Sequence, residues 1–211
     1  MTQQTLISPV MMAGIIETDT PKGLEAITTP ECAAVIWRRN SDFGFQAWID
    51  TLDPTLLPEV RLILRLDDIR SAVTDVCDMY GTPDDPERAY LINDISMLAN
   101  IFAGAFASSF LRLRLSPINT NACRRFHIDA ITARLICTYR GTGTQYGISK
   151  DGTPPRGIFT VPTGAPIVLR GTNWPERPAS GLLHRSPPIE GTDETRLVLV
   201  IDPIFDPEDA V

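Results

Sequence analysis

The chain of 211 residues contains only two histidines, and each stands beside residues that suggest a chemical role. His127 is followed two positions later by Asp129, within the segment RRFHIDA. In an extended segment, residues i and i+2 project from the same face, so this imidazole and this carboxylate can converge on one ion. His184 ends the apolar run GLLH, one residue before a Ser-Pro-Pro turn. Because two imidazoles and one carboxylate form the facial triad that suits non-haem Fe(II), the sequence predicts an Fe(II) site formed by His127, Asp129 and His184.

Arg196 is a second candidate functional residue, at the start of the run TRLVLVID. Both alternate faces of this run are apolar, which is typical of a strand buried on both sides. An arginine at its head needs an anion, because burying an unpaired charge is costly. That anion is either a ligand carboxylate, onto which a planar guanidinium forks well, or a neighbouring acid such as Asp193 or Glu194. Four further arginines either line a groove for an anionic substrate or form a solvated face: Arg112, Arg114, Arg124 and Arg125.

The elements that must position these residues change character near Phe110. The run FLRLRL alternates apolar and charged residues with the period of a strand. Short apolar runs follow at ITARLICTY, GIFTV, PIVLR, GLLH and TRLVLVID, separated by Gly and Pro, which is typical of a sandwich or barrel. The part before residue 109 is mixed, with strands expected at residues 33–39 and 61–66 and helices near residues 42–52, 69–80 and 86–109.

The stretch HIDAITARLICTYRGTGTQY, followed by GAPIVLRG, GLLHRSPP and TRLVLVID, resembles the core of the 2-oxoglutarate/Fe(II)-dependent dioxygenases, above all their prolyl-hydroxylase-like branch. It is also similar to an uncharacterised bacterial domain-of-unknown-function family with the pattern HxD…TYxGxGT…HRSPP. The resemblance covers about residues 126–202. It implies that His127, Asp129 and His184 bind iron and that Arg196 binds the distal carboxylate of 2-oxoglutarate. It also implies that Tyr139 is a second contact to that carboxylate.

The strand pattern and the resemblance together predict an α+β fold in which a double-stranded β-helix (jelly roll) carries N-terminal helices packed on one sheet. We expect a single domain over residues 1–211, because no segment has the composition of a linker. Within it, residues 1–108 form the mixed part and residues 109–203 the jelly-roll core with the metal site.

Composition and charge exclude several other classes of protein. The chain is 43% hydrophobic and 21% charged, as in ordinary soluble proteins, and its net charge of -7 argues against a nucleic-acid binder. The most apolar stretch, Met97 to Phe110, is interrupted by Asn100 and too short to cross a bilayer. The four cysteines form no CxxC pair, and the first residues lack the positively charged start of a signal peptide. We therefore expect a reduced, cytoplasmic protein that binds neither nucleic acid nor membrane.

Three functions remain open from the sequence. The first is an Fe(II)- and 2-oxoglutarate-dependent oxygenase that hydroxylates an unknown substrate, either a small molecule or a protein side chain. The second is a cupin-like protein that binds a metal or small ligand without turnover, and such a protein has no need for Arg196. The third is a structural barrel in which the two histidines are incidental.

Overall fold

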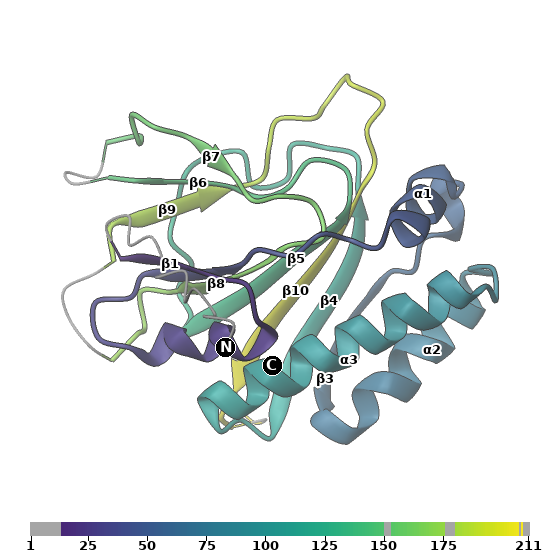
Figure 1. The fold of residues 1–211 in the computed structure, drawn as a ribbon, viewed down its shortest axis with the longest axis horizontal. Coiled ribbons are helices and arrows are strands. Elements are labelled where there is room, and N and C mark those ends of the chain that lie inside the picture. The colour runs from purple at the N-terminus through teal and green to yellow at the C-terminus, as the bar shows by residue number, and fades with distance from the viewer. Residues whose placement is uncertain (1–13, 150–152, 176–179, 207, 209–211) are drawn as a thin grey trace, which may run out of the picture.

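The computed structural model describes residues 14–149, 153–175, 180–206 and 208, and it contains two β-sheets with helices on one side (Figure 1). The larger sheet has the strand order β1-β2-β8-β5-β10-β4-β3, and the smaller sheet has the order β7-β6-β9. The strands are β1 (Ile15–Thr18), β2 (Ala34–Trp37), β3 (Val60–Arg65), β4 (Phe110–Ile118), β5 (Ala133–Arg140), β6 (Gln145–Ile148), β7 (Phe159–Thr160), β8 (Pro166–Arg170), β9 (Leu182–Arg185) and β10 (Arg196–Ile204). The helices are α1 (Phe43–Thr51), α2 (Ile69–Met79) and α3 (Pro86–Phe106), with short 3-10 helices at Pro21–Thr28, Pro54–Leu56 and Leu66–Asp68.

The two longest strands of the large sheet are β4 and β10, with nine residues each. They pair antiparallel along their whole length, from Arg196 opposite Ile118 to Ile204 opposite Phe110. In β4 the leucines are buried on one face while Arg112 and Arg114 lie on the other, as the alternation predicts. In β10 both faces are buried. The sheet therefore separates two apolar layers.

The first apolar layer lies between the large sheet and the helices, which cover one face of it (Figure 1). It joins Leu113 of β4 and Leu199 of β10 to α3 residues such as Leu91 and Phe102. By length and apolar composition, α3 is long enough to cross a membrane. The shorter stretch considered in the sequence, residues 97–110, is not. Its burial against β4 and β10, however, is that of a core helix.

The second apolar layer lies between the two sheets. The large sheet contributes Ile136, Val198 and Val200, and the small sheet contributes Tyr146 of β6 and Leu182 of β9. Successive residues of β5 and β10 therefore alternate between the helical layer and this inner layer. That alternation determines which side chains can reach a site between the sheets.

The structure confirms a mixed fold with a large, mainly antiparallel sheet and few helices. The expected helices and most expected strands are present, but β1 and β6 were not predicted. The large sheet also includes strands from the N-terminal part, because β2 pairs with β8, and β3 pairs with β4. The pair β1–β2 is parallel, unlike its antiparallel neighbours. Strands from both halves of the chain thus build one sheet.

A buried ion pair ties the large sheet to α3. The two terminal nitrogens of Arg39, just after β2, donate to the two carboxylate oxygens of Asp94 on α3 at 2.6 and 2.7 Å. Arg39 Nε also donates to the carbonyl of Gly164 at 2.7 Å, and the Tyr139 hydroxyl donates to Asp94 at 2.8 Å. Burial lowers the pKa of Arg39, but the hydrogen bonds and charge of Asp94 outweigh it and raise that pKa. Asp94 therefore serves as the counterion of the Arg39 guanidinium in the core.

We predict that Asp94→Ala destabilises the protein by about 3–5 kcal/mol, because it leaves the Arg39 guanidinium buried without its counterion. Asp75→Ala on α2 is the matched control, since Asp75 is exposed and its loss should change the free energy of unfolding by less than about 0.5 kcal/mol. Urea unfolding followed by circular dichroism measures both values. Equal stability of the two variants would contradict the role assigned to the pair.

Candidate metal centre

The two histidines face each other across a short backbone bridge. His127 N–H donates to the His184 carbonyl at 3.1 Å, and His184 N–H donates to the His127 carbonyl at 3.0 Å. Residues directly opposite each other in an antiparallel pair have their side chains on the same face. The two imidazole rings accordingly lie with their centroids 4.6 Å apart. The bridge joins β9 to a segment after β4 that belongs to no strand.

Asp129 completes the cluster on the same side. Its Oδ1 lies 3.5 Å from His127 Nε2, and its Oδ2 lies 3.1 Å from His184 Nε2. His127 Nδ1 lies 2.8 Å from the Arg125 carbonyl, which can only accept, so Nδ1 carries a proton and Nε2 is the ring nitrogen that faces Asp129. One donor atom from each of the three residues lies within 4.8 Å of the other two. The structure thus brings together all three ligands predicted from the sequence.

Arg134 on β5 holds the Asp129 carboxylate in place. Its Nη1 lies 2.7 Å from Asp129 Oδ2, while its Nε and Nη2 each donate to one oxygen of Asp202 on β10 at 2.7 Å. The bidentate pair with Asp202 fixes the plane of the guanidinium, since both partners are charged and both bonds are short. Arg134 is therefore a positioning residue for Asp129.

The electrostatics of the cluster favour a deprotonated ligand set. Burial raises the pKa of Asp129, but the contact with His184 and the charge of Arg134 outweigh it, and the pKa falls to about 2. Burial lowers the pKa of His184, and the neighbouring Asp129 compensates only in part. Asp129 is therefore ionised and His184 is neutral near pH 7, as metal coordination requires.

The donor atoms of this cluster suit a cation. Asp129 Oδ2 is buried and makes no hydrogen bond within the described part of the chain, although Arg134 Nη1 lies 2.7 Å away and His184 Nε2 lies 3.1 Å away. The guanidinium offsets part of the carboxylate charge, and the carboxylate oxygens keep lone pairs that an ion can use. Two imidazoles and one carboxylate are also the donor set of non-haem Fe(II) sites that keep open positions. The residues present therefore fit a divalent ion.

Gly171 allows the Asp129 segment to dock against the end of β8. A Cβ at Gly171 would lie 2.0 Å from the Ile131 carbonyl oxygen and 2.8 Å from that of Asp129. The backbone N–H of Thr172 donates to the Asp129 carbonyl at 2.9 Å. No side chain fits in this gap, so glycine here lets the backbone of the metal-ligand segment approach closely.

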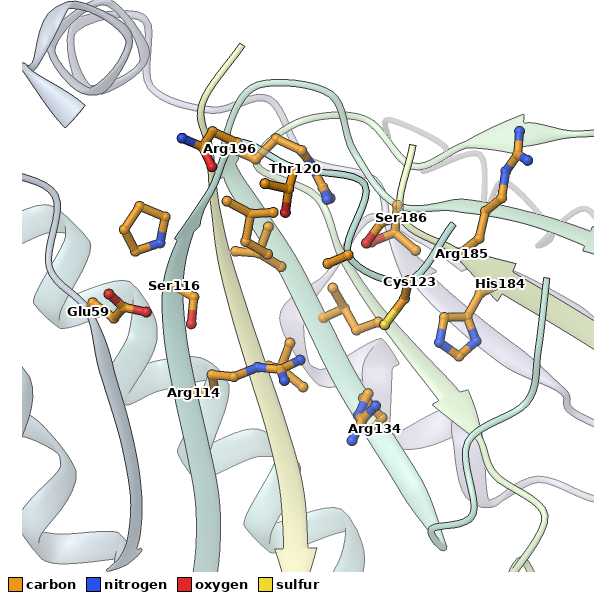
Figure 2. A pocket seen from close by; sticks show the side chains of 18 of the residues that line it. Glu59, Arg114, Ser116, Thr120, Cys123, Arg134, His184, Arg185, Ser186 and Arg196 are labelled. Atoms are coloured by element: carbon orange, nitrogen blue, oxygen red, sulfur yellow. The ribbon is translucent and has the colours of Figure 1, made fainter. Parts of the chain in front are cut away.

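A cavity of about 310 Å³ opens between the large sheet and the two histidines. Arg134 and Arg196 project into it from β5 and β10, and His184 faces them from β9 (Figure 2). Arg196 is only 1% exposed, and it donates to the Thr142 carbonyl at 2.6 Å and to Thr138 Oγ1 at 3.3 Å. Arg196 therefore lines the same cavity as His127 and His184, and its predicted contact with a ligand carboxylate stays a prediction.

Tyr139 does not share that cavity. It belongs to the alternate face of β5, with Leu135 and Cys137, and it packs in the layer against the helices. Its hydroxyl donates to Asp94 on α3, 2.8 Å away. The predicted contact of Tyr139 to a ligand carboxylate is therefore corrected, because the sheet stands between its side chain and the cavity.

Sequence reasoning missed the roles of Arg134, Asp202 and Gly171. Arg134 shares the cavity face of β5 with Ile136, and this parity was readable from the sequence. Its two acidic partners were not, since Asp202 lies on another strand and pairs with Arg134 only across the sheet. Gly171 gave no signal beyond its place after an apolar run.

Solved structures with this fold include two dioxygenases. The dioxygenase for auxin oxidation from rice gives a TM-score of 0.53 at 13% identity, covering 94% of this chain and 85% of that one. The dioxygenase for auxin oxidation 1 from Arabidopsis thaliana, in a binary complex with 2-oxoglutarate, gives a TM-score of 0.52 at 10% identity, covering 93% and 94%. At these identities the similarity establishes the fold. None of the curated proteins compared with the chain matches its sequence.

The family follows from the sequence itself. The model of the family described as "Protein of unknown function (DUF1826)" matches residues 18–202, and the chain belongs to this family. The resemblance to an uncharacterised family with a dioxygenase-like core is thereby confirmed.

We predict that His127→Ala, Asp129→Ala and His184→Ala each weaken Mn(II) binding by more than about 100-fold, because each removes one of three converging donors. Calorimetric titration of the purified protein measures the affinity. Glu59→Ala is the matched control, since Glu59 is an exposed acid that lines the same cavity without belonging to the cluster. Wild-type affinity in any of the three variants would contradict the metal centre.

Proposed function

We propose that the protein is an Fe(II)- and 2-oxoglutarate-dependent oxygenase that hydroxylates a small molecule. The observation that carries this proposal is the His127–Asp129–His184 cluster beside a cavity that Arg196 also lines. The shared fold of the two dioxygenases supports it, as does the 2-oxoglutarate in the Arabidopsis structure.

The proposal includes the finer description of the fold as a double-stranded β-helix. Three features support this description. Two sheets face each other, the side chains of His127, Asp129 and His184 lie between them, and helices cover the outside of the larger sheet (Figure 1). We also propose that the protein acts in the reducing cytoplasm, in keeping with its four free cysteines.

The residues of the cluster have separate tasks in this proposal. His127 and His184 offer Nε2 atoms, and Asp129 offers its carboxylate, to Fe(II). Arg134 orients that carboxylate by anchoring it to Asp202. When bound, Fe(II) together with 2-oxoglutarate supplies the oxidising power for hydroxylating a C–H bond.

Arg196 is suited to bind the distal carboxylate of 2-oxoglutarate. The partners that it contacts are neutral, and no described acid forms an ion pair with it. Glu194, the acid expected as an alternative partner, instead accepts hydrogen bonds from the backbone and hydroxyl of Thr142. Burial lowers the pKa of Arg196 to about 10, and the charge of Glu194 offsets this only in part. A carboxylate ligand would supply the missing counterion.

The apolar floor of the cavity has a complementary task. Ile136, Val198 and Val200 line it beside the arginines and are at most 6% exposed. Apolar walls lower the local dielectric and strengthen the pairing between Arg196 and a carboxylate. They also keep water away from the reacting centre.

We predict that Arg196→Ala weakens binding of 2-oxoglutarate to the Mn(II)-loaded protein by roughly two to three orders of magnitude, because an unpaired buried carboxylate costs about 3–5 kcal/mol. Pyruvate, which keeps the 2-oxo acid but lacks the distal carboxylate, should bind both forms equally weakly. Arg140→Ala is the matched control. Arg140 is the last residue of the neighbouring strand β5, but its side chain donates to the Leu52 carbonyl. Calorimetric titration gives all the affinities.

Two results would count against the proposal. If the wild type binds 2-oxoglutarate no better than pyruvate, Arg196 does not read the distal carboxylate. If Mn(II) binds but 2-oxoglutarate does not, the oxygenase proposal fails, and a cupin-like metal- or ligand-binding protein becomes the better account.

A further inference from the structure

Arg114 is the cavity arginine whose charge the proposed function leaves unused. It lies on β4, partly buried, on the same face of the large sheet as the metal cluster, and it lines the cavity (Figure 2). Within the described part of the chain, Arg114 makes no hydrogen bond and no ion pair. Arg134, in contrast, forms ion pairs with Asp129 and Asp202. A partly buried guanidinium with free donors is a ready site for an anion.

Arg114 is placed too far along the sheet to share the anion of Arg196. Arg196 pairs with Ile118 and Arg114 pairs with Val200, so their backbones are four residues apart, or roughly 13 Å. Burial lowers the pKa of Arg114 and the nearby charge of Arg134 lowers it further, while the charge of Asp202 offsets part of this effect. The pKa of Arg196, in contrast, responds to burial and to Glu194. The two guanidiniums therefore belong to different ends of the cavity.

The arginines of the cavity differ in what offsets their charge. The described residues that line the cavity include Arg114, Arg134, Arg185 and Arg196. Arg134 is paired with Asp129 and Asp202, and Arg196 is near the charge of Glu194. An arginine without an ion pair is complementary to an anionic ligand.

Arg185 is less suited than Arg114 to bind such an anion. Its Nε donates to Gln145 Oε1 at 2.8 Å, and its guanidinium lies 4.5 Å from the ring centre of Phe126. It also points outward, away from Arg114 (Figure 2). Arg114, in contrast, lies beside the apolar side chains of Ile136 and Val200 and the hydroxyl of Ser116. A carboxylate on Arg114 would place a hydrocarbon body over these apolar side chains.

We propose that Arg114 binds the carboxylate of the substrate, and that the substrate is a small carboxylic acid with an apolar body. This inference rests on the proposed oxygenase function and names the substrate class of that site. A cavity of about 310 Å³ is at the small end of ligand pockets, which favours a small molecule over a protein segment. A planar guanidinium matches a carboxylate with two parallel hydrogen bonds, so the carboxylate is favoured over a single-point acceptor.

The test uses the full-length protein loaded with Mn(II) and 2-oxoglutarate. The probes are benzoate and hexanoate, their neutral amides benzamide and hexanamide, and phenyl phosphate. Broadening of the probe proton resonances by the paramagnetic Mn(II) reports binding next to the metal and gives an affinity by titration. We expect each carboxylate to bind at least about 10-fold more tightly than its amide.

Arg114→Met should lower the affinity for the carboxylates by about 10- to 100-fold and leave the amides unchanged, because methionine keeps the apolar stem without the charge. Arg61→Met is the matched control, since Arg61 is exposed and lies directly across from Arg114 in the β3–β4 pair. The control should retain wild-type affinity for every probe. Unchanged Mn(II) and 2-oxoglutarate affinity in Arg114→Met shows that the variant is folded and that the metal centre is intact.

Each other outcome decides against some part of the inference. Equal binding of carboxylates and amides, or equal loss in both variants, overturns the anion site at Arg114. Tighter, Arg114-dependent binding of phenyl phosphate keeps the anion site but overturns the carboxylate. If 2-oxoglutarate fails to bind, the same titrations with Mn(II) alone still test Arg114, so failure of the proposed function is distinguishable from failure of this inference.

Discussion

The pair of backbone hydrogen bonds between His127 and His184 is the constraint on which the site depends. It fixes a segment that belongs to no strand against β9, and it places two residues distant in sequence directly opposite each other. Since opposed residues share a face, the two imidazoles converge without any further device. Asp129 follows His127 by two residues and reaches the same point. The close approach of its backbone to Gly171 holds it there.

The large sheet serves this cluster as a rigid platform with two different faces. Its outer face packs on the helices and is fastened to α3 by the Arg39–Asp94 pair. Its inner face carries the cavity, where Arg134 links the metal carboxylate to Asp202 on β10. The Arg39–Asp94 pair stabilises the fold, whereas the Arg134–Asp202 pair orients the carboxylate of Asp129. Similar ion pairs on the two faces therefore serve different purposes. This division places the cavity and the candidate metal centre on the inner face.

The sequence predicted that His127, Asp129 and His184 lie together, and it predicted most of the helices and strands. Its failures have physical causes. His127, Asp129 and His184 could be found because the chain has no other histidines and because i, i+2 spacing survives in any extended segment. The short strands β1 and β6 were not predicted, although β2 and β9, also of four residues, were. Neither IIET of β1 nor QYGI of β6 alternates strictly between apolar and polar residues. Tyr139 was misplaced because β5 is buried on both faces, so hydropathy does not tell which face meets the cavity. The pairing of Arg134 with Asp202 depends on sheet order, which no local pattern encodes.

The central claim is that His127, Asp129 and His184 hold a divalent iron ion beside a 2-oxoglutarate site. Anomalous scattering at the iron absorption edge, from crystals grown anaerobically with Fe(II) and 2-oxoglutarate, tests it most directly. The account predicts one strong anomalous peak within bonding distance of both Nε2 atoms and the Asp129 carboxylate, with density for the dicarboxylate extending from it to Arg196. No peak at the cluster, or a peak bound by other residues, would contradict the account.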